Sequence, residues 1–422
     1  MVRRYIACIL ILFASACLAL TGVFERWNFT FYDAALKFKN SFLENVSSQK
    51  DKQLVQVDIS ESAINSLPQG INAWENLAQT LSLLNEQDLP ILFPSFFAEN
   101  APASSMRKIL GQMQMNSFVV LPAVPVPNKI LPYLSEEISL SQKKTIEKHL
   151  LYPRVLNGQK IAKAERLLLP SDEFARFASA IAFVCSPQDA DCDGVLRRMN
   201  VFYAYSDGYI PSFAFAVAAK ILGIKMETVV LDCGSNLTFT CADGRDYSIP
   251  VDSEGRILIP YTGTEVFPSL NFEFFSQSYS DADVSYQISS ILKGKSVVLT
   301  DSTFEKSRGS QNFFSSPLGT TIPENKAELS LINAFLDNSF FSIYPLLAKY
   351  AILFFTVGLV FFAFLFGKRL TFFLTCFILG ILIVATELFL FVYMNIAPWI
   401  VGPLSVVFAG LIFGIFSIKT RR

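Results

Sequence analysis

Histidine and charged residues are scarce in this sequence. The chain of 422 residues has one histidine, His149, which excludes a histidine metal cluster or any site needing two imidazoles and disfavours a Ser-His-Asp triad. Only 17% of the residues are charged, and 35 Lys and Arg stand against 36 Asp and Glu, a net charge of −1. This balance lacks the basic excess typical of nucleic-acid binding. No CxxC pair occurs either, which disfavours a redox enzyme.

Apolar residues, by contrast, make up 52% of the chain, and the mean hydropathy is +0.40. Such values are typical of a membrane protein. Four runs are long enough to cross a bilayer as helices: residues 5–24, 346–366, 370–393 and 400–418. A cleaved signal is the alternative for the first run, because Ala14-Ser15-Ala16 resembles a cleavage site and, with Cys17, a loose lipidation box. The run continues apolar to Phe24, which favours a span.

Short basic clusters predict the orientation of these spans. If four spans alternate, one side of the membrane receives Arg3-Arg4, Lys368-Arg369 and residues 419–422. Short loops rich in Lys and Arg are cytoplasmic. We therefore predict a cytoplasmic leader (1–4) and a cytoplasmic tail (419–422), with residues 25–344 outside the cytoplasm. The predicted location is the inner membrane of a bacterium, with the lipid bilayer as a partner and no nucleic acid.

The predicted external segment alternates between strand and helix patterns. Strands are expected at residues 53–59, 90–97, 117–124, 180–185, 196–205, 256–261 and 295–300, with 180–185 and 196–205 paired. Helices are expected at residues 73–85, 211–222 and 324–337. This order begins with a βαβ unit. It predicts an α/β fold, a mixed sheet with flanking helices, beside a four-span α-helical membrane part.

Several segments in this order resemble the second class of CHASE domain, an extracellular sensory module. The resemblance covers nearly the whole chain and includes the plan of one N-terminal and three C-terminal spans. The matching pieces are VQVDIS (55–60), VVLP (119–122), DCDGVLRR (191–198), PSFA (211–214), IPYTG (259–263), LKGKSVVL (292–299) and SPLG (316–319). The chain is divergent, and one departure is Thr300, where such domains have glycine.

The resemblance implies a sensory receptor. The family usually passes its signal to a cytoplasmic catalytic or kinase domain, whereas this chain stops at Arg422, just after its last apolar run. The first hypothesis is a transducer, without a catalytic site or cofactor of its own, that relays a signal to a separate cytoplasmic effector protein. The alternatives are a truncated receptor-type cyclase or kinase and a non-signalling envelope scaffold. The ligand and its binding residues cannot be identified from the sequence.

The motif Asp189-Ala190-Asp191-Cys192-Asp193-Gly194 imitates the start of a calcium loop. Its twelfth position is Asn200 where a calcium loop has a bidentate glutamate, and strands are predicted on both sides of it. The alternative is a plain turn in which Gly194 takes a positive φ and Arg197 or Arg198 pairs with an aspartate. No metal is assigned.

Four of the seven cysteines lie in the predicted external segment and form two local pairs. An oxidising compartment would favour the disulfides Cys185–Cys192 and Cys233–Cys241. Four reduced thiols in buried strands are the alternative.

Two features stand out in the membrane runs. Glu387 is the one acidic residue inside a run, and it is interpreted either as a functional relay or as a hydrogen-bonded group near the outer boundary. Gly410 and Gly414 form a GxxxG motif, which predicts close helix packing within the bundle or across a homodimer.

Overall fold

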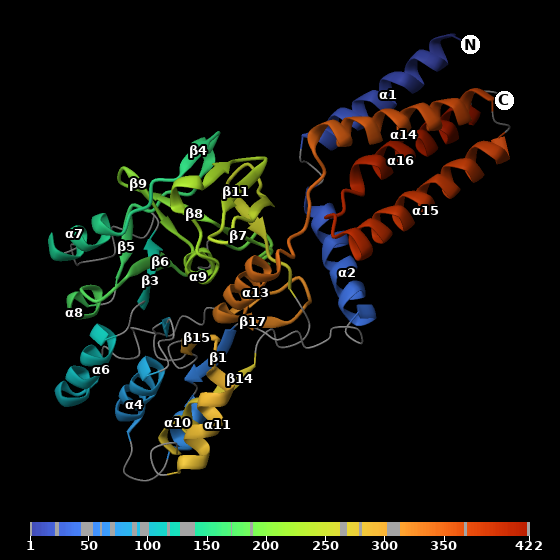
Figure 1. Cartoon of the computed structure of the whole chain (residues 1–422). Coiled ribbons are helices and arrows are strands. Elements are labelled where there is room, and N and C mark those ends of the chain that lie inside the picture. The colour runs from blue at the N-terminus through green and yellow to red at the C-terminus, as the bar shows by residue number, and fades with distance from the viewer. Residues whose placement is uncertain are drawn as a thin grey trace. The chain divides into compact units, whose positions relative to one another are not determined.

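The computed structural model describes most of the chain and divides it into two compact units. The membrane unit comprises residues 1–44, 317–319 and 341–422, and the α/β unit comprises residues 45–316 and 320–340. Figure 1 shows the elements of both units. The described residues are 2–21, 25–43, 54–59, 61–67, 72–86, 91–92, 101–115, 119–126, 140–169, 171–185, 189–261, 268–277, 281–301, 313–366 and 369–419.

The α/β unit is built on a seven-stranded sheet. Its strands are β1 (Leu54–Ile59), β2 (Ile91–Leu92), β3 (Val119–Val126), β5 (Arg166–Leu168), β6 (Ala180–Phe183), β14 (Ser269–Asn271) and β15 (Ser296–Asp301). The order is β14-β1-β15-β2-β3-β5, and β6 also pairs with β3. All pairs are parallel except β3 with β5. Parallel sheets are covered on both faces, which explains why β1 buries Leu54, Val55, Val57 and Ile59 completely.

Helices make the crossovers that parallel strands require. They are α3 (Glu61–Asn65), α4 (Ala73–Glu86), α6 (Ala103–Met115), α7 (Leu140–Lys148), α8 (Asp172–Ala175), α10 (Phe272–Gln277) and α11 (Ala282–Leu292). Helix α4 follows β1 and packs against α6 and α10. It buries Leu77, Leu81 and Leu84, whose spacing places them on one helix face.

A second, four-stranded sheet has the order β12-β11-β10-β4. Its strands are β4 (Arg154–Leu156), β10 (Val230–Asp232), β11 (Asn236–Thr240) and β12 (Asp246–Pro250). Three further strand pairs are β7 (Arg198–Asn200) with β13 (Arg256–Leu258), β8 (Phe202–Tyr205) with β9 (Gly208–Pro211), and β16 (Phe313–Ser315) with β17 (Thr321–Pro323).

Two helices, α9 (Phe213–Leu222) and α13 (Glu324–Asp337), pack against each other in the α/β unit. Ser212 caps α9 by accepting a hydrogen bond from the Phe215 amide. The rings of Phe215 and Phe335 meet edge to face with centroids 5.8 Å apart. Helix α13 ends at Asp337, and the next residue, Asn338, has a left-handed φ of 49°.

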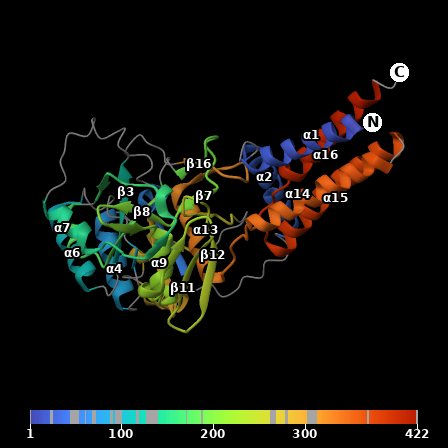
Figure 2. The ribbon, with the colours of Figure 1, turned by 90° about the horizontal axis from the view of Figure 1, so that it is seen from above.

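The described part of the membrane unit contains five helices. These are α1 (Val2–Leu20), α2 (Glu25–Leu43), α14 (Leu346–Phe366), α15 (Arg369–Met394) and α16 (Val401–Lys419). Helices α1, α14, α15 and α16 lie side by side in both views (Figures 1 and 2). Their shared core buries Leu12, Val360, Phe372 and Val406, one from each helix.

The prediction of four membrane spans is confirmed only in part. Residues Leu347–Leu365 and Leu370–Met394 are long and apolar enough to cross a membrane. A third span would need α1 and α2 together, with a bend of 70° between them, and the described apolar part of α16, Val401–Ile415, is shorter. Helix α1 ends at Leu20, short of the predicted Phe24. Helix α2 was not predicted, because its sequence mixes polar and apolar residues. Lys368 and residues 420–422, which bear on the orientation, lie outside the described residues.

The central sheet contains the predicted βαβ start, but one predicted strand pairing is wrong. Strand β6 pairs with β3 and not with residues 196–205. Residues 196–205 divide at Val201 into β7 and β8, which pair with β13 and β9. The cause is a tight turn after Tyr205, where Ser206 takes a φ of 51° and folds β8 back onto β9, while the wholly apolar β6 extends the buried parallel sheet.

Candidate functional site

The motif Asp189 to Gly194 forms a tight turn before β7. Gly194 takes a φ of +78°, and its amide donates to the Asp191 carbonyl at 2.8 Å. The Asp191 amide in turn donates to the Val195 carbonyl at 3.0 Å. A residue with a Cβ is strained at that φ, which explains the glycine.

Two arginines donate hydrogen bonds to the carboxylates of this turn. The Arg197 side chain is only 2% exposed. Its guanidinium donates to Asp191 at 3.2 Å and to Asp193 at 2.9 Å. The hydrogen bond from Arg197 lowers the pKa of the Asp193 carboxyl. Arg198 donates its Nε to Asp191 at 3.1 Å and its Nη1 to Asp252 at 3.1 Å.

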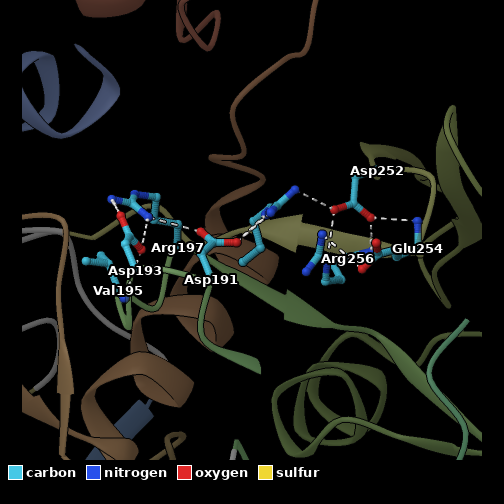
Figure 3. A network of polar contacts seen from close by, with 8 residues as sticks. Asp191, Asp193, Val195, Arg197, Asp252, Glu254 and Arg256 are labelled. Carbon is cyan, nitrogen blue, oxygen red and sulfur yellow. Dashed lines mark hydrogen bonds and ion pairs between the residues drawn. The ribbon is translucent and has the colours of Figure 1, made fainter. Parts of the chain in front are cut away.

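These contacts continue into one chain of alternating charges (Figure 3). Arg256, on β13, donates its Nε to Asp252 at 2.8 Å and its Nη2 to Glu254 at 3.0 Å. The network therefore ties the turn before β7 to β13 and to the turn that precedes β13. We call it the arginine network; its members are Asp191, Asp193, Arg197, Arg198, Asp252, Glu254 and Arg256.

In the structure the carboxylates of this motif meet arginine, amide and hydroxyl donors. Asp189 is buried and accepts hydrogen bonds from Asn200 at 2.7 Å and from the Tyr203 hydroxyl at 3.0 Å. Burial, followed by the charge of Asp189, raises the pKa of Tyr203. Within the described residues, no group of three His, Cys, Asp or Glu side chains could hold a metal ion. Arginine and amide donors take the carboxylate oxygens that a cation would need.

The structure forms neither predicted disulfide. All seven cysteines lie in the described part of the chain, and none is joined to another. Cys185 is buried at the end of β6, where its amide donates to Glu328 at 2.9 Å, whereas Cys192 is exposed on the turn. Cys233 and Cys241 are both buried. Burial raises the pKa values of these two thiols, so the uncharged form is favoured.

Glu328 of α13 is a buried carboxylate that sequence reasoning missed. It is 3% exposed and accepts two backbone hydrogen bonds, from Cys185 at 2.9 Å and from Ala214 at 3.2 Å. Ala214 lies in the first turn of α9, where amides have no partner within the helix. Glu328 therefore locks α13 to α9 and to the end of β6. The sequence did contain a signal for its burial: Glu328 lies on the apolar face of α13, one turn before the buried Leu331 and Ile332.

Polar side chains also gather at the carboxyl edge of the parallel sheet. Asp58 on β1 lies in register with Asn271 on β14 and with Thr300 on β15. Its carboxylate accepts a hydrogen bond from the Thr300 hydroxyl at 2.9 Å. Thr300, which departs from the family pattern, therefore has a partner at the end of β1. Ligands of open parallel sheets bind at this edge.

The chain segment between α13 and α14 is hydrogen-bonded to the turn between α15 and α16. The Ser342 amide donates to the Asn395 carbonyl, and the Ala397 amide donates to the Ser342 carbonyl, both at 2.8 Å. The Phe341 ring stacks on Phe391 with centroids 5.1 Å apart. We call this arrangement the junction; it comprises residues 341–344, the end of α15 and residues 395–399.

Glu387 belongs to the junction. Its carboxylate accepts a hydrogen bond from the Trp399 amide at 3.1 Å and another from the Tyr344 hydroxyl. Glu387 is 5% exposed, and its two donors come from the segments that precede α14 and α16. Glu387 is therefore hydrogen-bonded, as one of its two interpretations expected.

Helix α2 also packs on the junction. Asn28 accepts a hydrogen bond from the Val401 amide at 3.0 Å, which caps the start of α16. The Tyr32 ring meets Phe391 edge to face at 5.6 Å. Lys39 donates to Asn395 and lies 5.0 Å above the Phe341 ring, a cation–π distance.

The two glycines of the GxxxG motif face helices of the same chain. A Cβ at Gly410 would collide with Val360 of α14, and one at Gly414 would stand 2.6 Å from the Phe372 ring of α15. The small residues therefore allow α16 to approach α14 and α15 closely.

The fold defines a class: one chain that contains an α/β unit and a bundle of apolar helices. The model of the CHASE2 domain family matches residues 6–365, so the chain belongs to the CHASE2 domain family. CHASE2 domains are sensory extracellular domains typical of signalling receptors. The match includes α1 and α14 as well as the whole α/β unit. No curated protein and no solved structure matches the chain.

Proposed function

We propose that this protein is a transmembrane transducer. In this proposal the α/β unit detects a signal outside the cytoplasm, four helices cross the membrane, and a separate cytoplasmic effector protein receives the signal. Catalytic output then belongs to that partner. The observation that carries the proposal is the junction, where the segment leaving α13 is hydrogen-bonded to the turn between α15 and α16.

The proposed route starts at Glu328. Because Glu328 joins α13 to α9 and β6, a rearrangement of the α/β core moves α13. Only residues 338–345 separate α13 from α14, and Ser342 within them is paired with Asn395 and Ala397. A displacement of α13 therefore pulls on α14 and on the α15–α16 turn together. The buried contacts among α1, α14, α15 and α16 carry the change to the cytoplasmic ends.

A relay requires two arrangements of the bundle that differ in affinity for the effector. Packing of α16 through Gly410 and Gly414 offers such a switchable contact, because small residues let helix backbones slide past one another at close range. The hydrogen bonds that Ser342 and Glu387 make at the junction support this role.

The experiment measures the distance between two helices of the bundle in a variant that frees α13 from α9 and β6. Full-length protein in liposomes, with its seven cysteines replaced by serine, carries spin labels at Leu365 of α14 and Ile415 of α16, both exposed. Glu328→Ala, which leaves two buried amides unpaired, should shift the distance distribution between the labels. Asp337→Asn, at the exposed end of the same helix, is the matched control and should leave it unchanged.

A second variant tests the junction itself. Ser342→Pro removes the amide that donates to Asn395, so adding it to Glu328→Ala should abolish the shift. An unchanged distribution in Glu328→Ala, measured on protein whose α/β unit still resists proteolysis, would reject the relay. A shift that persists in the double variant would reject the junction as its route.

A further inference from the structure

A groove on the membrane unit lies between α2 and the start of α16. Its volume is about 700 Å³, within the range of small-molecule sites. The α2 side places Trp27, Phe31 and Ala34 at helical spacing. The α16 side supplies Ile400 and Leu404.

Among the described residues that line this groove, Arg26 is the charged one. A cation above an otherwise apolar lining suits an amphiphile whose anionic head meets the guanidinium while its chain lies along the apolar walls. The positive end of the α16 dipole, at Val401, favours an anion at the same place. Because Asn28 already accepts from the Val401 amide, the charged donor on this lining is the Arg26 guanidinium.

Trp27 adds a second indication of lipid. Its side chain is 69% exposed. Such a large apolar surface is unfavourable in water, but tryptophan is enriched at the level of the phospholipid head groups. Helix α2 directly follows the apolar α1 and buries its other face, through Tyr32 and Leu36. This division of faces is typical of helices that lie in the membrane interface.

We propose that this groove binds one phospholipid, with Arg26 holding the phosphodiester and the α2–α16 walls holding the upper part of an acyl chain. A bound lipid then contacts α2 and α16 together, beside the hydrogen bond from Val401 to Asn28, and stabilises the junction. The proposal requires that α14 and α15 lie in a membrane, but it does not require the relay.

The experiment titrates purified full-length protein in detergent with phosphatidylglycerol and counts bound lipid by native mass spectrometry. One lipid per chain should bind saturably. Arg26→Gln should weaken this binding by at least about tenfold, the worth of a charge-assisted hydrogen bond. The matched control is Lys37→Gln, which removes the same charge from the same helix outside the groove and should change the affinity less than about twofold. Trp27→Ala should also weaken binding.

Three further arms identify the ligand. Diacylglycerol, which lacks the phosphate, should bind at least about tenfold more weakly than phosphatidylglycerol. Glycerol 3-phosphate, which lacks the chains, should not compete at equal concentration. Equal binding of diacylglycerol, tight binding of glycerol 3-phosphate, or unchanged binding in Arg26→Gln would overturn the proposal. So would a homodimer, seen by light scattering, that shields Trp27 and excludes lipid.

Discussion

Arg197 is a full positive charge in the interior of the α/β unit. Its side chain is 2% exposed, as is that of Asp191, its partner. Desolvation of two such charges is expensive, and it is offset only when each retains several hydrogen bonds. The arginine network provides them by alternating charges from Asp193 to Arg256. Its role is therefore to fix the geometry of β7 and β13 more than to add net stability.

Removal of the central arginine should expose this dependence. Arg197→Met leaves the buried Asp191 carboxylate with fewer donors and should lower the free energy of unfolding by about 3–5 kcal/mol. Pulse proteolysis of the full-length protein over a urea series measures it. Arg245→Met, which breaks an exposed pair with Asp243, is the control and should cause no resolved loss. Equal stability of the two variants would show that the network is not a structural clamp.

The same network predicts a dependence on pH. The hydrogen bond from Arg197 lowers the pKa of Asp193 in the folded protein, below about 3.9 in an unfolded chain. The contribution of Asp193 is therefore complete above the unfolded pKa and is lost as pH falls through the folded one. Asp193→Asn should flatten the decline of the free energy of unfolding between about pH 5 and pH 2. Asp207→Asn, on the exposed turn after β8, should keep the full decline.

At this scale the sequence was ambiguous for a physical reason. Alternate aspartates before a glycine serve a cation or an arginine equally well, because both need converging oxygens. The choice depended on where Arg198 and Asp252, far apart in sequence, came together, and only the β7–β13 pairing brought them there. Glu328 was missed because a charged residue on a helix is most often solvated.

At the scale of elements, hydropathy predicted the positions of helices and strands better than it predicted which strands pair. The α4, α9 and α13 helices and the β1, β3 and β15 strands lie within a few residues of their predicted ranges, because each has a clear apolar period. The pairing of β6 depended on which strand it met after a long loop, which local pattern does not contain. Helix α2 mixes Trp and Phe with Lys and Asp, so it resembled neither a span nor a globular helix.

The packing of α16 gives a prediction about elements. Gly410→Leu places a side chain against Val360, and overpacking of this kind costs about 1–3 kcal/mol. It should lower the thermal stability of the membrane unit in detergent, and in the proposed relay it should reduce the downstream response. Gly414→Leu, against Phe372, should act alike.

A matched glycine is available on α14. A Cβ at Gly358 meets nothing within 4 Å, so Gly358→Leu should preserve both the stability and the response. Proteolytic resistance of the α/β unit should be the same in all three variants, since that unit is a separate compact body. If Gly358→Leu were as damaging as Gly410→Leu, a general intolerance of leucine in the bundle would explain both.

For the whole molecule, the number of spans decides where the signal can emerge. Four spans place both ends of the chain on one side, together with Arg369 at the start of α15. Three spans, with α1 and α2 forming one bent crossing and α16 not crossing, place the C-terminal end on the side opposite the N-terminus. The burial of α1 and α16 in one core with α14 and α15 supports four, because a helix lying outside the bilayer would not share that core.

A reporter fused after Arg422 separates these arrangements. In the four-span arrangement the basic tail remains in the cytoplasm, as the distribution of short basic loops favours, so a green fluorescent protein should fluoresce there and an alkaline phosphatase should be inactive. A second fusion within the exposed turn at Asp207 should give the reverse pattern, because the four-span arrangement puts the α/β unit on the other side. Phosphatase activity at both positions would show that α16 does not cross the membrane. The effector would then have to contact the turn between α14 and α15, and the close packing of Gly410 and Gly414 would serve the outer end of the molecule instead of the cytoplasmic one.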